Sequence, residues 1–449
     1  MFRVLFLAVF MLPQILLGQT TIPFSSSARV DNSAPQAGQS TPPAAAAPKS
    51  ERPAATQLTL DQAIDMALKY SPSIKAARTQ IQQNQAQEVT ANLRPNPTLS
   101  WDSQFIPIFS GDFSTDTLNN LQQFDIGVGY LFERGHKRQN RLAAAKDQTA
   151  VTMATVADTE RTLVFNVAQQ FINVLLANST LEFALQDLNS FQETVNISEE
   201  RYKAGDISEG DNLKIKLQLL QFQTDVSSAR VAKVQALGSL RQLIGYANVP
   251  HDYDCAGDLA YQPLTASLPD LQVKALAERP DLKAAKVGVK AANSQVSLAK
   301  ANGKVDVNAQ ASYSHVSGAS STSLFFSLPL QFFDRNQGEI ARTKYALTQA
   351  DLTEKASEDT VMTDVTNAYE AAASNQDVVK LYVSGYLKQA QDSRDISQYA
   401  YKGGAATLLD FLDAERSYRA TQLAYRQALA AYMLSLEQLR QATGTRSLP

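Results

Sequence analysis

The sequence predicts a mainly α-helical fold with transmembrane β-strands, arranged as two tandem copies of one unit. Three observations predict this fold. The segment around Ala67 recurs around Ala275, about 200 residues later. Four short segments alternate apolar and polar residues, which is the period of a β-strand. Long stretches without proline repeat apolar residues every seven positions, which predicts coiled-coil helices.

The N-terminus predicts export of the chain. One basic residue, Arg3, precedes the apolar run Val4 to Leu17 and the small residue Gly18, a pattern typical of a signal peptide at residues 1–18. An uncleaved anchor is the alternative, although the run is shorter than the roughly 20 residues that span a bilayer. Residues 19–57 are rich in Pro, Ala, Ser, Thr and Gln, and they predict a flexible leader.

Composition excludes several classes of function. The formal net charge of −3 argues against nucleic-acid binding, which needs a basic face. Cys255 is the only cysteine, so neither an intramolecular disulfide nor a thiolate metal cluster can form. With three His and no Ser-His-Asp order, phosphate-binding Gly loop, HExxH or CxxC motif, the sequence predicts no enzyme. We expect no catalytic residue, no metal site and no cofactor.

The repeat sets the expected domain boundaries. The first structural repeat is expected at 58–266 and the second at 267–449. Each should hold a helix, a strand pair and a long helical hairpin, followed by a linker in the first repeat and a short tail in the second. The register rests on Ala67-Leu68, Pro72 and Lys75-Ala76-Ala77, which match Ala275-Leu276, Pro280 and Lys283-Ala284-Ala285.

The strand pairs are expected at 98–132 and 305–332. In the first, Leu99 and Trp101 alternate with Ser100 and Asp102, so one face is apolar and the other polar. The four strands are expected at 98–105, 124–132, 305–313 and 324–332, with polar loops at 106–123 and 317–322. Runs of about 9 to 11 residues suit a tilted membrane-spanning strand. A soluble sandwich with one face buried is the alternative.

Four strands do not close a barrel, and open edges are not tolerated in lipid. Neighbouring chains are therefore expected to close the sheet. Two chains would give a small barrel filled by side chains, whereas three would give twelve strands around a wet lumen, which the small polar positions suit better. The strands thus predict a trimer.

The helical hairpins are expected at 139–244 and 341–443. Roughly 65 residues of helix before Ala204 would make a rod of about 100 Å. Gly205 and Gly404 interrupt the two hairpins, and Ser208 and Thr407 can cap the helices that follow. Two seams are expected: Val167, Val174, Leu181, Leu188, Val195 and Tyr202 in the first helix, and Leu213, Leu217, Leu220, Val231 and Val234 in the second.

Beyond the leader, the chain resembles the TolC-type outer-membrane efflux proteins. The resemblance rests on Thr59-Leu60-Asp61-Gln62-Ala63, on Asn92-Leu93-Arg94-Pro95-Asn96-Pro97, on the glycine turns, and on Leu408-Leu409-Asp410-Phe411-Leu412-Asp413-Ala414-Glu415. It implies a homotrimer whose twelve-stranded β-barrel lies in the outer membrane lipid of a Gram-negative type envelope, above an α-helical tunnel in the periplasm.

The resemblance also implies the function and the partners. Such a protein is the exit duct of a tripartite efflux pump, docked to a periplasmic adaptor (membrane fusion protein) and to an inner-membrane transporter of the RND type. It would carry small molecules or ions out of the cell. A type I secretion channel for polypeptides is one alternative, and a periplasmic coiled-coil adaptor or structural protein is an alternative of another class.

The family pattern implies site residues at the narrow periplasmic end. Two inward Asp fall on Asp410 and Asp413, three residues apart on one helix face, and three chains would gather six carboxylates near the axis. Alternatively, these Asp only favour the helix dipole. A Tyr matching Tyr401 would meet an Asp matching Asp211, whereas the position of a partnering Arg holds Ala406.

The two glycine turns match the tips that meet the adaptor, and their alternative reading is an ordinary helix stop. The expected adaptor contacts are Gly205, Asp206, Ile207, Ser208, Gly404, Ala405, Ala406 and Thr407. The strand-to-helix junctions at 132–138 and 333–338 resemble the heavy-metal exporting branch. Their basic cluster is otherwise a solvated anchor at a membrane interface.

Overall fold

The computed structural model describes residues 56–104, 116 and 123–446. The expected signal peptide at 1–18, nearly all of the expected leader and most of the expected loop at 106–123 lie outside the described residues. The last two residues of the expected leader, Thr56 and Gln57, belong to a short strand.

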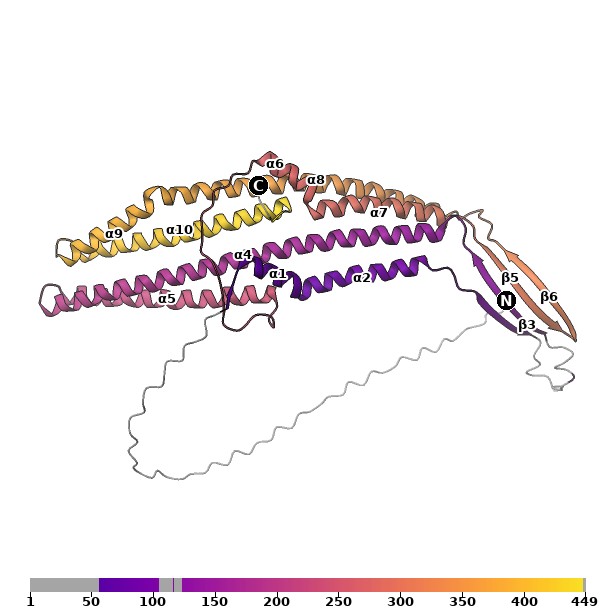
Figure 1. Ribbon diagram of the computed structural model, residues 1–449, viewed down its shortest axis with the longest axis horizontal. Coiled ribbons are helices and arrows are strands. Elements are labelled where there is room, and N and C mark those ends of the chain that lie inside the picture. The colour runs from indigo at the N-terminus through magenta and orange to yellow at the C-terminus, as the bar shows by residue number, and fades with distance from the viewer. Residues whose placement is uncertain (1–55, 105–115, 117–122, 447–449) are drawn as a thin grey trace, which may run out of the picture. The chain divides into compact units, whose positions relative to one another are not determined.

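The two halves of the described chain repeat one order of elements, as the duplication predicts (Figure 1). The first half holds β1 (Thr56–Leu58), α1 (Leu60–Tyr70), α2 (Pro72–Asn92), β2 (Thr98–Gln104), β3 (Gln123–Phe132), α4 (Lys137–Lys203), α5 (Glu209–Ile244) and β4 (Tyr253–Cys255). The second holds α6 (Leu268–Glu278), α7 (Pro280–Asn302), β5 (Val307–Val316), β6 (Ala319–Ser327), α8 (Gln337–Leu381), a π-helical turn η1 (Tyr382–Tyr386), α9 (Leu387–Lys402) and α10 (Leu408–Thr443).

Local sequence explains where the short helices begin. Thr59 caps α1, because its hydroxyl accepts the backbone N–H of Gln62 while the Gln62 side chain accepts that of Thr59. Pro72 and Pro280 begin α2 and α7, where a missing N–H costs nothing. The matching prolines therefore divide the same helix pair in both repeats.

The four longer strands form one antiparallel sheet in the order β2-β3-β5-β6. The central β3–β5 pairing, in which Ile126 faces Tyr313, joins the two repeats. The register confirms the predicted alternation, since Leu99, Trp101 and Phe326 share one face while Ser100 and Gln310 share the other. On the polar face, the Gln310 amide donates to the Ser100 hydroxyl at 3.1 Å. Strands β2 and β6 are the two edges.

The second strand pair differs from its prediction in the residues that its second strand covers. β6 spans 319–327 instead of 324–332, and the expected loop at 317–322 is a two-residue turn at Ser317 and Gly318. Both turn residues have positive φ, 48° and 83°, as twisted two-residue hairpins require. Pro329 explains the early end of β6, because proline lacks an N–H and restricts the residue before it.

Helix α4 has 67 residues and packs against four other helices, α2, α5, α7 and α10. The predicted seam on α4 is correct except at its last residue: Val167, Val174 and Val195 are buried, Leu181 and Leu188 are half-buried, and Tyr202 is 40% exposed. The predicted seam on α5 is wrong within one chain. Its residues are exposed, Leu217 by 69%, and α5 instead packs on α4 through Ile215, Phe222, Val226 and Ala229.

The first helix of the hairpin expected at 341–443 is interrupted. Five residues of π-helix, Tyr382 to Tyr386, separate α8 from α9, and Gly385 has a φ of 147° inside this turn. A π-turn with a glycine bends a helix. Within the described chain, no helix is both long enough and apolar enough to cross a membrane.

Candidate functional site

The two helical hairpins end in turns of the same design. After α4, Gly205 has a φ of 84° and Asp206 N–H donates to Arg201 O at 2.9 Å. After α9, Gly404 has a φ of 77° and Ala405 N–H donates to Ala400 O at 2.8 Å. Only glycine adopts this left-handed conformation without cost, so each glycine ends its helix.

Ser208 and Thr407 then cap the next helices, α5 and α10. The Ser208 hydroxyl accepts Asp211 N–H at 3.1 Å, and the Thr407 hydroxyl accepts Asp410 N–H at 3.2 Å. The turn residues at 205–208 and 404–407 are exposed, apart from Ile207 and Ala406, which are half-buried. The residues predicted to contact an adaptor therefore form two accessible tips on one chain. α4 connects the first tip to the sheet, so tip and sheet lie at opposite ends of this helix (Figure 1).

The predicted pore carboxylates, Asp410 and Asp413, are both exposed on the first turns of α10. Asp410 completes a capping box, because its carboxylate accepts Thr407 N–H at 3.2 Å and the Thr407 hydroxyl at 2.6 Å. Asp413 lies 3.7 Å from Arg416, and both side chains are largely exposed. Asp410 thus has a capping role in the single chain, and Asp413 stays available to solvent.

The predicted contact between Tyr401 and Asp211 is not made in the described chain. The Asp211 carboxylate accepts the Ser208 hydroxyl at 2.9 Å and lies 3.3 Å from Lys214. Tyr401 is 4% exposed, and its hydroxyl has no hydrogen-bond partner. Because Ser208 and Lys214 lie on the same turn as Asp211, local partners satisfy this carboxylate.

Arg201 joins the two hairpins at the tips, although no local sequence pattern marks it. Its guanidinium donates to Tyr401 O at 2.7 Å and lies over the Tyr401 ring, 5.3 Å from the ring centre. Beneath it, Phe222, Phe191, Phe411 and Tyr401 stack in succession, with neighbouring ring centres 4.3 to 6.3 Å apart. These rings come from α5, α4, α10 and α9, so one aromatic stack holds all four helices together.

A buried charge cluster lies behind this stack and was also missed. The carboxyl groups of Glu415 of α10 and Asp187 of α4 are neighbours, and each acts on the pKa of the other. Arg419 of α10 lies 2.6 Å from Asp187 and also pairs with Asp225 of α5. Arg394 of α9 lies over the ring of Tyr418, 4.4 Å from its centre, and its charge acts on both carboxyl groups.

This cluster shifts the pKa of both acids. Burial, followed by the negative charge of Asp187, raises the pKa of Glu415 to about 7. Burial also raises the pKa of Asp187, although Arg419 opposes the shift. Near neutral pH the pair can therefore share one proton between the two hairpins.

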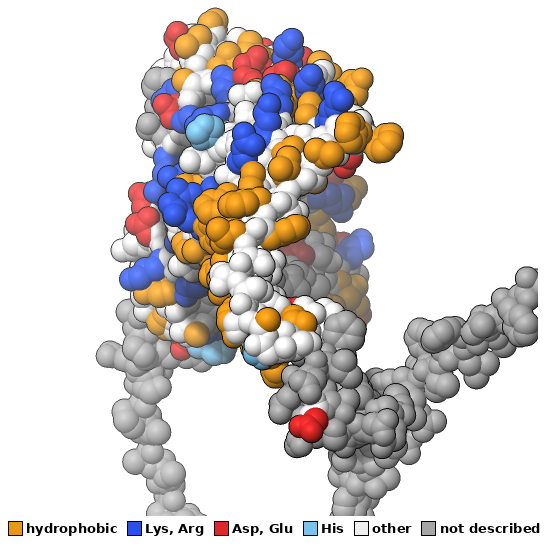
Figure 2. All heavy atoms as spheres, turned by 90° about the vertical axis from the view of Figure 1, so that its right-hand side faces the viewer, with side chains coloured by type: hydrophobic (Ala, Val, Ile, Leu, Met, Phe, Trp, Pro, Cys, Tyr) orange, Lys and Arg blue, Asp and Glu red, His pale blue; other side chains and the backbone are white. Residues whose placement is uncertain are grey.

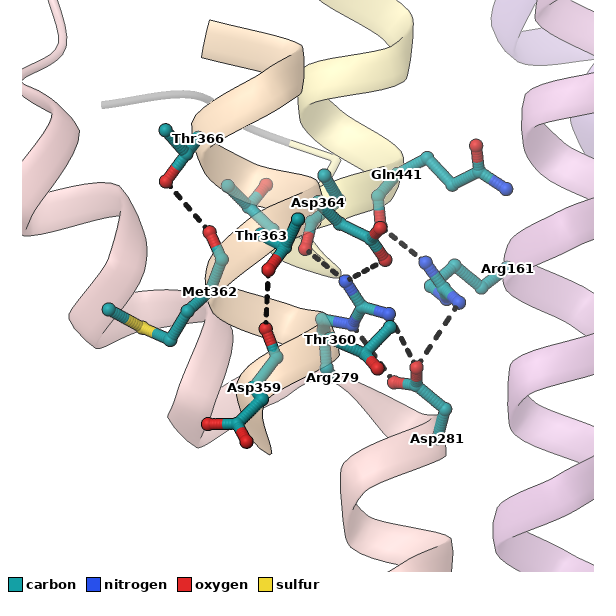
Figure 3. A network of polar contacts seen from close by, with 12 residues as sticks. Arg161, Arg279, Asp281, Asp359, Thr360, Met362, Thr363, Asp364, Thr366 and Gln441 are labelled. Atoms are coloured by element: carbon teal, nitrogen blue, oxygen red, sulfur yellow. Dashed lines mark hydrogen bonds and ion pairs between the residues drawn. The ribbon is translucent and has the colours of Figure 1, made fainter. Parts of the chain in front are cut away.

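A second polar network joins the repeats near the C-terminus of α10 (Figure 3). Arg279, which is 2% exposed, contacts Asp281 with its Nη2 at 2.5 Å and Asp364 with its Nη1 at 2.9 Å. Its Nη1 also donates to Ala442 O at 3.3 Å. Arg161 of α4 donates to Gln441 O at 2.6 Å. Burial alone would raise the pKa of Asp281, but hydrogen bonds from Arg279 outweigh burial and lower it.

Among the described residues, no group of three or more His, Cys, Asp or Glu side chains could hold a metal ion. Cys255 is buried as a free thiol, and burial raises its pKa to about 12. The structure therefore offers the tips, their carboxylates and the sheet as the functional surfaces.

Comparisons with known proteins agree with this arrangement. The sequence profile described as Outer membrane efflux protein matches residues 63–246 and 271–445, one match in each repeat. The cobalt-zinc-cadmium resistance protein CzcC of Cupriavidus metallidurans is 25% identical over 390 residues, which cover 83% of this chain and 87% of CzcC. The pyoverdine export outer membrane protein OpmQ of Pseudomonas aeruginosa is 25% identical over 412 residues, covering 86% of this chain and 83% of OpmQ.

A crystal structure of CusC has the same fold. The two structures align with a TM-score of 0.72 at 19% identity, covering 88% of this chain and 96% of that chain. This match confirms the predicted fold class. It does not support the alternatives of a soluble sandwich and of a periplasmic adaptor. Because the profile match covers both repeats, the chain belongs to the outer membrane efflux protein family and is an efflux channel component of the outer membrane, not an enzyme.

Proposed function

We propose that three copies of this chain form a passive exit duct for a tripartite efflux pump. The observation that carries this proposal is the four-stranded sheet with one apolar face, one polar face and two open edges. Unpaired backbone groups cost several kcal/mol each in lipid. Pairing β2 of one copy with β6 of the next removes every edge, and three copies give twelve strands around a polar lumen.

The exposed stripe on α5 supports assembly of identical chains. Leu213, Leu217, Leu220, Val231 and Val234 share the heptad positions of one face, and all are more than half exposed. An apolar stripe of this length is costly in water. A second copy covers it with its own helices and so extends the closed sheet into a closed helical tunnel.

The tips are the surfaces that we assign to a periplasmic adaptor, and Asp410 and Asp413 are the groups that we assign to the constriction. Exposed backbone and small side chains at 205–208 and 404–407 allow helical hairpins of a partner to approach closely. An inner-membrane transporter of the RND type would supply the energy. The cargo, small molecules or ions, would pass along polar walls without coordination.

Assembly should depend on the α5 stripe. We expect the unmodified protein to be a trimer in detergent and to form ion-conducting pores in planar bilayers. Replacing Leu217 and Leu220 with Glu places two charges per chain in the interface and should abolish both properties, measured by light scattering and by conductance. Gln223→Glu, a charge beside the stripe, is the control. A double variant that remains a conducting trimer would contradict the proposed packing.

The constriction should prefer cations. Converting Asp410 and Asp413 together to Asn removes six charges per trimer while keeping side chains of similar size, and Asn can still serve near a helix start. We expect the cation-to-anion permeability ratio to fall severalfold, measured from reversal potentials in a salt gradient. Asp377→Asn, an exposed acid on α8, is the control. An unchanged ratio in the double variant would remove the charge-ring role.

A further inference from the structure

A basic hollow lies where the sheet joins the long helices. It measures about 900 Å³, and its lining includes four exposed cations, Arg134 from the first repeat and Lys300, Lys304 and Arg335 from the second. No acidic side chain is among the described residues that line it. Four like charges around one space create a strong positive potential.

None of the nearby acids among the described residues forms an ion pair with these cations, and Asp334, next to Arg335 in sequence, accepts Asn336 N–H at 2.8 Å. Glu133 pairs with Arg141 at 2.8 Å, and Asp306 pairs with Lys137 at 2.6 Å. Arg134 contacts Asp306 only through its backbone N–H, and Arg335 donates to a neutral carbonyl, Gln331 O. Across residues 56–104 and 123–446, the four side-chain charges therefore lack a carboxylate partner.

The hollow is held in shape by close contacts, one between the two repeats and two within the second repeat. A Cβ on Gly135, whose φ is 68°, would lie 2.7 Å from Lys304 Cγ, and a Cβ on Gly303 would lie 2.8 Å from Arg335 O. The Asn336 amide also donates to Ala299 O at 2.8 Å. The first two contacts require glycine, and all three fix the backbones near the four cations.

An exposed apolar segment adjoins the hollow. Leu328, Leu330, Phe332 and Phe333 connect β6 to Arg335, and Phe333 is 93% exposed. Figure 2, which faces the sheet end of the structure, shows hydrophobic side chains next to a group of Lys and Arg side chains. Cations beside exposed aromatic and aliphatic side chains match a ligand with an anionic head and apolar tails.

We propose that the hollow binds the headgroup of an anionic phospholipid, whose acyl chains lie along residues 328–333 and the apolar face of the sheet. This inference rests on the proposed function, because that function places the helix end of the sheet at the periplasmic surface of the outer membrane. Basic pockets at such an interface bind phospholipid headgroups through their phosphates. One lipid per chain would fill the junction between barrel and tunnel.

The test measures lipid retained by the full-length trimer. Delipidated protein is titrated with dioleoyl-phosphatidylglycerol, and bound lipid is counted by native mass spectrometry. Dioleoyl-phosphatidylethanolamine, with the same tails, and glycerol 3-phosphate, with no tails, are run in parallel. We expect phosphatidylglycerol to bind at three per trimer and more tightly than either. Lys300→Gln with Lys304→Gln should weaken it roughly ten- to thirty-fold, at about three- to fivefold per lost charge.

The control removes the same charge elsewhere: Lys355→Gln with Lys388→Gln, both exposed on α8 and α9, should bind phosphatidylglycerol as the unmodified protein does. Equal affinity in the Lys300/Lys304 variant would overturn the site. Glycerol 3-phosphate binding as tightly as the lipid would also overturn it, by identifying a site for small anions. Conductance of the same preparations separates the failure of this proposal from the failure of the proposed function. If the protein forms pores but does not prefer phosphatidylglycerol, only the lipid site is rejected. If it forms no pores, the proposed channel is rejected.

Discussion

Replacing Arg279 with Met should be among the most destabilising single changes in this protein, lowering the free energy of unfolding by about 2–3 kcal/mol. The side chain is almost fully buried and satisfies Asp281, Asp364 and Ala442 O together. Methionine fills similar volume, so the loss comes from the uncompensated carboxylates rather than from a cavity. Thermal unfolding followed by circular dichroism would show a fall of several degrees in Tm.

Two further variants make this result specific. Arg279→Lys keeps the charge but cannot reach both carboxylates and the carbonyl with one ammonium group. Its Tm should therefore lie between those of Arg279→Met and the unmodified protein. Arg342→Met removes an exposed arginine that pairs with Glu339 on the same helix face, and its Tm should not change. An Arg279→Met protein as stable as Arg342→Met would show that the contacts of Arg279 in Figure 3 do not hold the helices of the second repeat together.

The parts of the fold that sequence predicted are those fixed by local periodicity. Alternation at Leu99 to Asp102 identified strand faces, and Gly205 and Gly404 marked both tips, because these signals depend on neighbouring residues alone. The end of β6 was misplaced because the apolar residues Leu328, Leu330 and Phe332 continue the alternation past Pro329. The proline should have taken precedence, since it restricts the residue before it.

The remaining errors of the sequence-based predictions concern which helix faces pack against each other. A heptad pattern marks an apolar stripe but does not name its partner, so the α4 seam was buried as expected whereas the α5 stripe was not. Arg201, Arg279 and Glu415 escaped notice for a related reason. Each acts through residues about 80 to 230 positions away, and one sequence shows no sign of such a contact. A charged residue at an apolar position of a helix, as Glu415 is, was the one available signal.

Stability should fall as pH rises from about 5 to about 8, because of the acid pair between the hairpins. Glu415 has an ordinary pKa of 4.5 when unfolded and a pKa of about 7 when folded. Between these values the folded state binds more protons than the unfolded state, so protonation favours folding and its contribution disappears above pH 7. The difference corresponds to about 3 kcal/mol, and the raised pKa of Asp187 acts in the same direction.

Glu415→Gln tests this origin, because glutamine can still donate a hydrogen bond to Asp187 but does not titrate. We expect its Tm to change little between pH 5 and pH 8, whereas the Tm of the unmodified protein falls by several degrees. Glu209→Gln, an exposed acid at the start of α5, should keep the full pH dependence. If the Tm of Glu415→Gln fell by the same amount, the pH dependence would come from other groups.

The acid pair should also make the effect of pH local. Asp187 belongs to α4 and Glu415 to α10, so loss of the shared proton weakens the contact between the two hairpins specifically. Alkaline pH should therefore loosen the tips before it unfolds the sheet.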